Sequence, residues 1–101
     1  MDPERISDFN ISDVVVSTAG RDQDKLFYVI GTDPVYLTLV TGKDRTREKP
    51  KRKKRKHVQK VLRSETRVAA KIISGDKVLN SELRRDLAFH AGHLQANNLG
   101  G

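Results

Sequence analysis

The sequence predicts a small, mainly β domain followed by a helical segment, and three observations support this fold class. Two apolar runs, residues 14–16 and 26–30, are rich in the β-branched and aromatic side chains that favour strands. A third run, residues 35–40, alternates between two faces with the period of a half-buried strand. From residue 64 onward, apolar residues recur at three- and four-residue spacings, which is typical of helices.

The size and composition of the chain set further bounds. Its 101 residues allow one compact domain, and 36% hydrophobic residues without tryptophan predict a small aliphatic core. No apolar run approaches the roughly 20 residues of a membrane-spanning helix, and the N-terminus is too acidic and polar for a signal peptide. The absence of cysteine excludes disulfides and thiolate metal sites. We therefore expect a cytoplasmic monomer without membrane contact.

The predicted β part follows a polar leader, residues 1–10. A first strand occupies residues 11–18, and Gly20 can take a positive φ where the chain leaves it. The second strand, residues 25–30, ends at a turn over residues 32–34, where Asp and Pro disfavour a continued central strand. With the third strand, these segments form an antiparallel meander that needs further strands to close into a barrel.

A strongly basic segment, residues 43–60, follows the third strand, and we call it the basic arm. Between residues 43 and 63, twelve Lys and Arg stand against two acidic residues, a local charge of +10; the rest of the chain carries −3, which gives the net +7. Residues 51–56 lack any apolar side chain, so they form either a solvated edge strand or a segment that orders on a partner. Val58, Val61 and Leu62 are the candidates for a closing strand.

This concentration of positive charge predicts a polyanionic partner. The alternatives are a solvated linker, a nuclear localisation signal or attraction to an anionic membrane, although no apolar residue is interleaved to insert into lipid.

Residues 13–31 resemble the KOW motif of ribosomal and transcription proteins, with an apolar strand, Gly20, a polar loop and a second apolar strand. The third strand and a basic run ending in Lys56 and His57 make the layout similar to small bacterial KOW domain-containing RNA-binding proteins, relatives of large-subunit ribosomal proteins of archaea and eukaryotes. The resemblance implies an SH3-like barrel over residues 11–62 that binds RNA, above all ribosomal RNA.

The loop departs from the KOW pattern at one place. Many KOW loops carry a second glycine, and here Gln23 and Asp24 occupy that region. Asp22 and Asp24 could also hold the loop cations Arg21 and Lys25 in local ion pairs.

The predicted RNA-binding residues combine the basic arm with the loop cations that the resemblance implies. Lys and Arg neutralise phosphates and release counterions, and arginine can also make bidentate contacts or stack on bases. The set is Arg21, Lys25, Lys43, Arg45, Arg47, Lys49, Lys51, Arg52, Lys53, Lys54, Arg55, Lys56, His57 and Lys60.

Two helices are predicted in a helical appendage, residues 63–95. Ser64 is the expected cap of the first helix and Gly75 its end, although residues 74–76 could instead turn a hairpin. Asn80 is the expected cap of the second helix, whose apolar stripe is Leu83, Leu87, Ala91 and Leu94. A disordered tail is expected over residues 96–101.

Other chemistry finds less support in the sequence. Tyr28 and Tyr36 could stack on bases or pack in the core. His90 and His93 could reach one metal ion, but no third ligand is placed near them. No motif of a catalytic site is present, so we expect no enzyme, metal or cofactor. The alternative function is a module that contacts a ribosomal or transcription protein, with non-specific nucleic-acid affinity from the arm.

Overall fold

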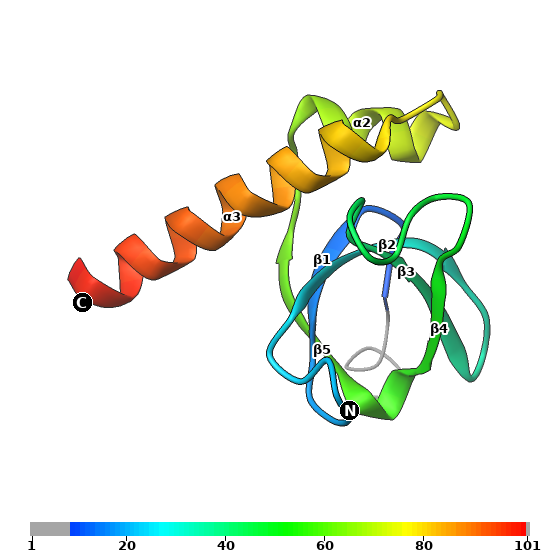
Figure 1. Cartoon of the computed structure of the whole chain (residues 1–101), viewed down its shortest axis with the longest axis horizontal. Helices are drawn as coiled ribbons and strands as arrows, with labels where there is room; N and C mark the ends of the chain where they lie inside the picture. The colour runs from blue at the N-terminus through cyan, green and yellow to red at the C-terminus, as the bar shows by residue number, and fades with distance from the viewer. Residues whose placement is uncertain (1–8, 101) are drawn as a thin grey trace, which may run out of the picture.

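The computed structural model describes residues 9–100, with side chains described for residues 9–94, and contains a five-stranded antiparallel sheet (Figure 1). The strands are β1 (Asp13–Ser17), β2 (Leu26–Thr32), β3 (Tyr36–Val40), β4 (Lys51–Lys54) and β5 (Val58–Arg63). Their order in the sheet is β4-β3-β2-β1-β5. The predicted mainly β, barrel-like fold with helices at its C-terminal end is confirmed.

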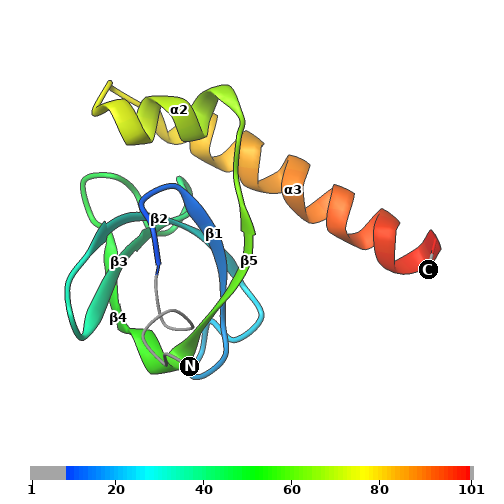
Figure 2. The same ribbon diagram turned by 180° about the vertical axis from the view of Figure 1, so that it is seen from behind.

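The sheet curls into a barrel that stays open between its two edge strands, β4 and β5. β5 returns to pair with β1, from Asp13 opposite Arg63 to Ser17 opposite Val58, with an irregularity in register between Val14 and Val15. A bulge of this kind bends a strand and increases its twist. The short 3-10 helix η1 (Arg55–His57) connects β4 to β5 at one end of the barrel (Figure 2).

Both faces of the central strands are covered by apolar side chains. The interior of the barrel holds Val15, Phe27, Val29, Leu37, Leu39 and Val58. On the outer face, Val14, Tyr28 and Val40 pack against the helices. Burial on two sides explains why the first two strands read as continuous apolar runs. The third strand begins one residue later than predicted, since Val35 lies in the turn and is 52% exposed.

The helix α2 (Arg67–Ser74) forms where the sequence left a helix or a hairpin open. Thr66, and not Ser64, is its cap: the Thr66 hydroxyl accepts a hydrogen bond from the Ala69 N–H at 3.2 Å. The prediction for Ser64 is wrong because its side chain is buried in a polar cluster described below. Gly75 ends the helix as predicted, in the left-handed conformation with φ 81°.

The helix α3 (Asn80–Gly100) is capped through Leu79 rather than Asn80. The Leu79 N–H donates to the Glu82 carboxylate at 3.0 Å, which is one half of a capping box, and the Leu79 carbonyl accepts a backbone hydrogen bond from the Glu82 N–H at 3.0 Å. The Asn80 side chain instead accepts from the Arg47 N–H and donates to Glu48. Asn80 therefore ties the helix to the basic arm.

The helices share a core with the sheet, so the predicted appendage packs as part of the domain. Leu83 and Leu87 of the apolar stripe are buried against the outer face, whereas Ala91 is exposed. The C-terminal end of α3 projects beyond the barrel (Figures 1 and 2). Within the described residues, none of the helices combines the length and apolarity needed to cross a membrane.

Two predictions concern the ends of the chain. The disordered tail expected over residues 96–101 is helical through Gly100, because each added helical residue gains a backbone hydrogen bond and Asn disfavours a helix only weakly. Residues 1–8 of the predicted leader and Gly101 lie outside the described residues.

Candidate nucleic-acid interface

The basic arm follows one edge of the barrel, drawn in green in Figure 1, from the loop beside the helices along β4 to η1. Of the two states predicted for residues 51–56, the edge strand is the one that forms: β4 pairs with β3 from Tyr36 opposite Lys54 to Leu39 opposite Lys51. Alternate side chains point to opposite faces of a strand. Lys51 and Lys53 are half-buried, whereas Arg52 and Lys54 are exposed.

Asp22 holds the β1–β2 loop, residues 18–25, against β4. Its carboxylate accepts hydrogen bonds from Lys53 Nζ at 3.0 Å and from Ser17 Oγ at 2.8 Å, and it lies 3.3 Å from Lys51 Nζ. Lys53 also donates to the Ala19 carbonyl at 2.9 Å. The loop and the arm therefore lie side by side, and the two inner lysines are engaged by the protein itself.

The alternative that Asp22 and Asp24 pair with Arg21 and Lys25 inside the loop is wrong, because the loop residues pair with other segments. Asp22 pairs with β4 as described, and Lys25 pairs with Asp44 of the β3–β4 loop. Gly20 has the predicted positive φ, 83°. Asp24, in the region where many KOW loops carry a second glycine, also has a positive φ, 73°, which Asp tolerates better than most residues.

Two loop carboxylates have lowered pKa values. Burial raises the pKa of Asp22, but hydrogen bonds from Lys53, Ser17 and Lys51 outweigh burial and lower it from 3.8 to about 2. Hydrogen bonds from Lys25 and Thr41 likewise lower the pKa of Asp44 to about 2. Both carboxylates thus stay ionised in the folded protein at pH values where the unfolded chain takes up protons.

We expect Asp22→Asn to reduce the free energy of unfolding at pH 7 by about 2 kcal/mol, the equivalent of the pKa shift. Since the folded pKa lies below the unfolded one, the contribution of Asp22 is fully present above its ordinary pKa of 3.8 and is lost as the pH falls through about 2. Urea unfolding across this pH range should show that the free energy of unfolding decreases less steeply with falling pH in the variant than in the unmodified protein. Asp76→Asn, at an exposed carboxylate on the turn after α2, is the control; equal profiles for both variants would contradict the role of Asp22.

Several predicted RNA-binding residues are occupied by contacts within the protein. Lys60 lies 3.1 Å from the buried carboxylate of Asp13, and Arg52 lies 3.0 Å from Asp33. The Arg52 guanidinium also covers the half-buried Tyr36 ring at 4.3 Å from its centroid. Arg55 donates to the Asp33 carbonyl at 2.8 Å. These contacts position the arm, and the two ion pairs reduce the charge that it presents to a partner.

The other predicted residues divide into two groups. Arg47 lies 3.9 Å from Glu48, and His57 is half-buried with its carbonyl accepting from the Thr18 N–H. Within residues 9–94, the remaining cations of the set have no carboxylate within ion-pair distance, and all but the half-buried Arg45 are exposed: Arg21, Lys43, Arg45, Lys49, Lys54 and Lys56. We call these six the unpaired cations.

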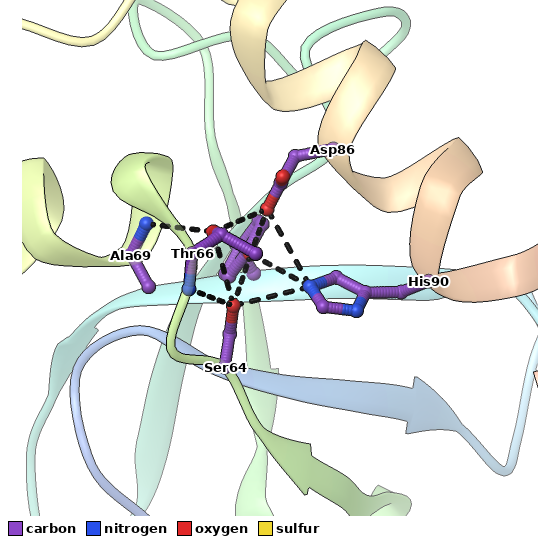
Figure 3. Close-up of polar contacts among 6 residues, drawn as sticks. Ser64, Thr66, Ala69, Asp86 and His90 are labelled. Atoms are coloured by element: carbon purple, nitrogen blue, oxygen red, sulfur yellow. Dashed lines mark hydrogen bonds and ion pairs between the residues drawn. The ribbon is translucent and has the colours of Figure 1, made fainter. Parts of the chain in front are cut away.

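A buried polar cluster joins the sheet to α3, and the sequence did not predict it (Figure 3). The Tyr28 hydroxyl donates to Asp86, contacts Ser64 Oγ at 2.7 Å and lies 3.2 Å from His90 Nε2. Thr66 donates to Asp86 at 2.9 Å. Of the two interpretations of Tyr28, burial is therefore the one that holds. The i, i+4 spacing of Asp86 and His90 beside the apolar stripe was the available signal.

Ser64, His90 and Asp86 are the residue types of a hydrolase triad, but their geometry differs from one. Ser64 Oγ at 3.1 Å and Asp86 Oδ2 at 3.5 Å both approach Nε2 of His90. In a triad, the carboxylate instead holds the second ring nitrogen. The cluster therefore has the arrangement of a structural network between the sheet and α3. His93 is exposed and stacks on Phe89, whereas His90 is buried.

Comparison with known proteins adds no family assignment: the sequence matches no protein-family model, and none of the curated proteins matches it. The resemblance to KOW proteins stays a prediction from the residue pattern.

Proposed function

We propose that this protein binds RNA through the phosphate backbone and that the unpaired cations of the basic arm form the contact surface. The observation that supports this function is that the lysines of β4 fall into two kinds, those paired with a carboxylate of the protein and those that are exposed and unpaired. Lys51 and Lys53 fix the strand through Asp22, while Lys54 extends from the exposed side of the same strand without a carboxylate partner among residues 9–94. An exposed cation such as Lys54 releases counterions from RNA when it binds a phosphate, and this release favours binding.

RNA is favoured over other polyanions by the resemblance to KOW proteins, which implies ribosomal RNA of the large subunit as the target. The setting of the proposed function is the cytoplasm, with the protein acting as a monomer and without a catalytic step, metal or cofactor. Lysines predominate among the unpaired cations, so the arm recognises phosphate positions rather than base edges.

We expect the triple variant Lys49→Gln, Lys54→Gln, Lys56→Gln to bind a large-subunit ribosomal RNA fragment on the order of 100-fold less tightly at 0.1 M salt. Each phosphate contact contributes about −0.7 to −0.9 to the slope of log K against log salt. Loss of three contacts should therefore make this negative slope shallower by about 2 to 3. Fluorescence anisotropy over a salt series measures both quantities.

The control variant removes the same charge from α2, α3 and the connection between them, through Arg67→Gln, Lys77→Gln and Arg85→Gln. All three side chains are exposed and lie outside the arm. The arm is rejected as the binding surface if the two triple variants change the affinity and the slope equally, or if the arm variant binds like the unmodified protein.

A second candidate function is contact with another protein through the helices, with the arm adding only non-specific affinity. The exposed apolar side chains Ile73, Leu79 and Phe89, which are 64%, 51% and 60% exposed, favour it. This function predicts equal affinity for a folded ribosomal RNA fragment and an unstructured RNA of the same length, because non-specific affinity does not depend on how the phosphates are arranged. Competition between the two RNAs distinguishes the functions.

A further inference from the structure

A groove of about 510 Å³ lies between α3 and two segments of the barrel, residues 24–26 and 41–44. Its volume falls in the range of about 300–1,000 Å³ that is usual for ligand sites. Leu87, Ala88 and Ala91 line it from α3, and Leu26 lines it from the barrel. The groove thus offers apolar walls directly beside the basic arm.

Three cations and two carboxylates line this groove, and one cation, Lys25, is paired with Asp44. Lys43 is one of the unpaired cations, and Arg84 is held in place because its Nη1 donates to the Gly42 carbonyl at 3.1 Å. A fixed guanidinium presents a planar face on which an aromatic base can stack. The combination of aliphatic walls with a planar cation suits a flat, weakly polar ring that carries negative charge nearby.

A second, smaller pocket of about 170 Å³ adjoins the groove across the ion pair of Lys25 and Asp44, which lines both. Arg21 and Arg45 line this pocket, and neither has a carboxylate within ion-pair distance among residues 9–94. Arginine binds phosphate oxygens through two parallel hydrogen bonds. Asp22 and Asp44 also line the pocket, but each is paired with lysine, so the pocket keeps a net positive charge beside the apolar groove.

We infer that the groove takes one unpaired RNA base, turned out of a loop or bulge, while the adjoining pocket takes a phosphate of the same nucleotide. This inference rests on the proposed function and makes it more specific: the arm supplies general affinity, and the groove selects RNA with unpaired nucleotides. Bases within a continuous duplex are stacked and paired, so they cannot enter a groove of this kind without being turned out.

The test compares a hairpin RNA carrying one bulged 2-aminopurine with the same stem fully paired. We expect the unmodified protein to bind the bulged RNA about tenfold more tightly, the effect of one stacked base, and to change the 2-aminopurine fluorescence. Ala88→Phe fills the groove from an exposed helical position and should bind both RNAs with the affinity of the paired stem. Ala91→Phe, three residues along the same wall, provides a second version of the test if the first variant does not fold.

The matched control is Ala70→Phe, which places the same ring at an exposed position of α2 outside the groove and should keep the preference. Equal binding of both RNAs by the unmodified protein, or a preference that survives both groove substitutions, would overturn the inference and leave the groove to a protein segment. The proposed function fails separately, if the arm triple variant binds the paired stem as tightly as the unmodified protein does.

Discussion

Gly42→Ala is expected to lower the free energy of unfolding by roughly 2–6 kcal/mol, from backbone strain together with overpacking. Gly42 has φ 83°, which disfavours any residue with a Cβ. A Cβ at this position would also lie 2.2 Å from the Asn80 carbonyl oxygen and 2.9 Å from the Arg84 backbone nitrogen. The β3–β4 loop thus touches the first turn of α3, and one added methyl group should push the helix off the barrel.

Gly75→Ala separates the two contributions to this effect. Gly75 has nearly the same φ, 81°, but a Cβ there would meet no atom within 4 Å. Gly75→Ala should therefore lower the free energy of unfolding by only about 1–2 kcal/mol, the cost of placing alanine in the left-handed conformation. Urea unfolding followed by circular dichroism measures both variants. A loss for Gly42→Ala no larger than for Gly75→Ala would contradict the close contact between loop and helix.

Tyr28→Phe is expected to lower the free energy of unfolding by about 1–3 kcal/mol, because it removes one hydrogen bond from the buried Ser64 hydroxyl and one from the Asp86 carboxylate. Burial, together with the hydrogen bond to Asp86, raises the pKa of Tyr28 from 10.0 to about 12. The contribution of the protonated phenol is fully present below pH 10 and is lost as the pH rises through about 12. In Tyr28→Phe, the free energy of unfolding should therefore decrease less than in the unmodified protein as the pH rises from 10 to about 12.

Tyr36→Phe is the control for this prediction. The Tyr36 ring is half-buried beneath Arg52, and within the described part of the chain its hydroxyl makes no hydrogen bond. The substitution should change the free energy of unfolding little and keep the alkaline profile. If both variants lose the same stability, the cluster around Tyr28 does not hold α3 to the sheet.

The local pattern was sufficient for most elements because it reflects burial directly. Val14 and Val15 point to opposite faces and are both fully buried, so the apolar run indicated a central strand. The pattern was insufficient for β4, which has no apolar face. Its strand conformation depends on backbone pairing with β3 and on the carboxylate of Asp22, which is remote in sequence.

The caps were predicted less well than the helices themselves. Ser64 and Thr66 both carry hydroxyls near the start of α2, and only the network around Tyr28 determines that Ser64 is used elsewhere. Asn80 is a good capping residue by type, but its side chain binds the basic arm across the domain. A residue with several available partners takes the one that the folded chain brings near.

By itself, the sequence determined the mainly β class, the approximate positions of β1, β2 and β3, and the concentration of positive charge in one segment, because composition and periodicity are local properties. Only the tertiary structure decided which lysines of that segment face the protein's own carboxylates and which remain unpaired. The groove beside α3 likewise exists only in the folded structure. Both depend on contacts between segments far apart in the chain, and those contacts arise only when the helices pack on the outer face of the sheet.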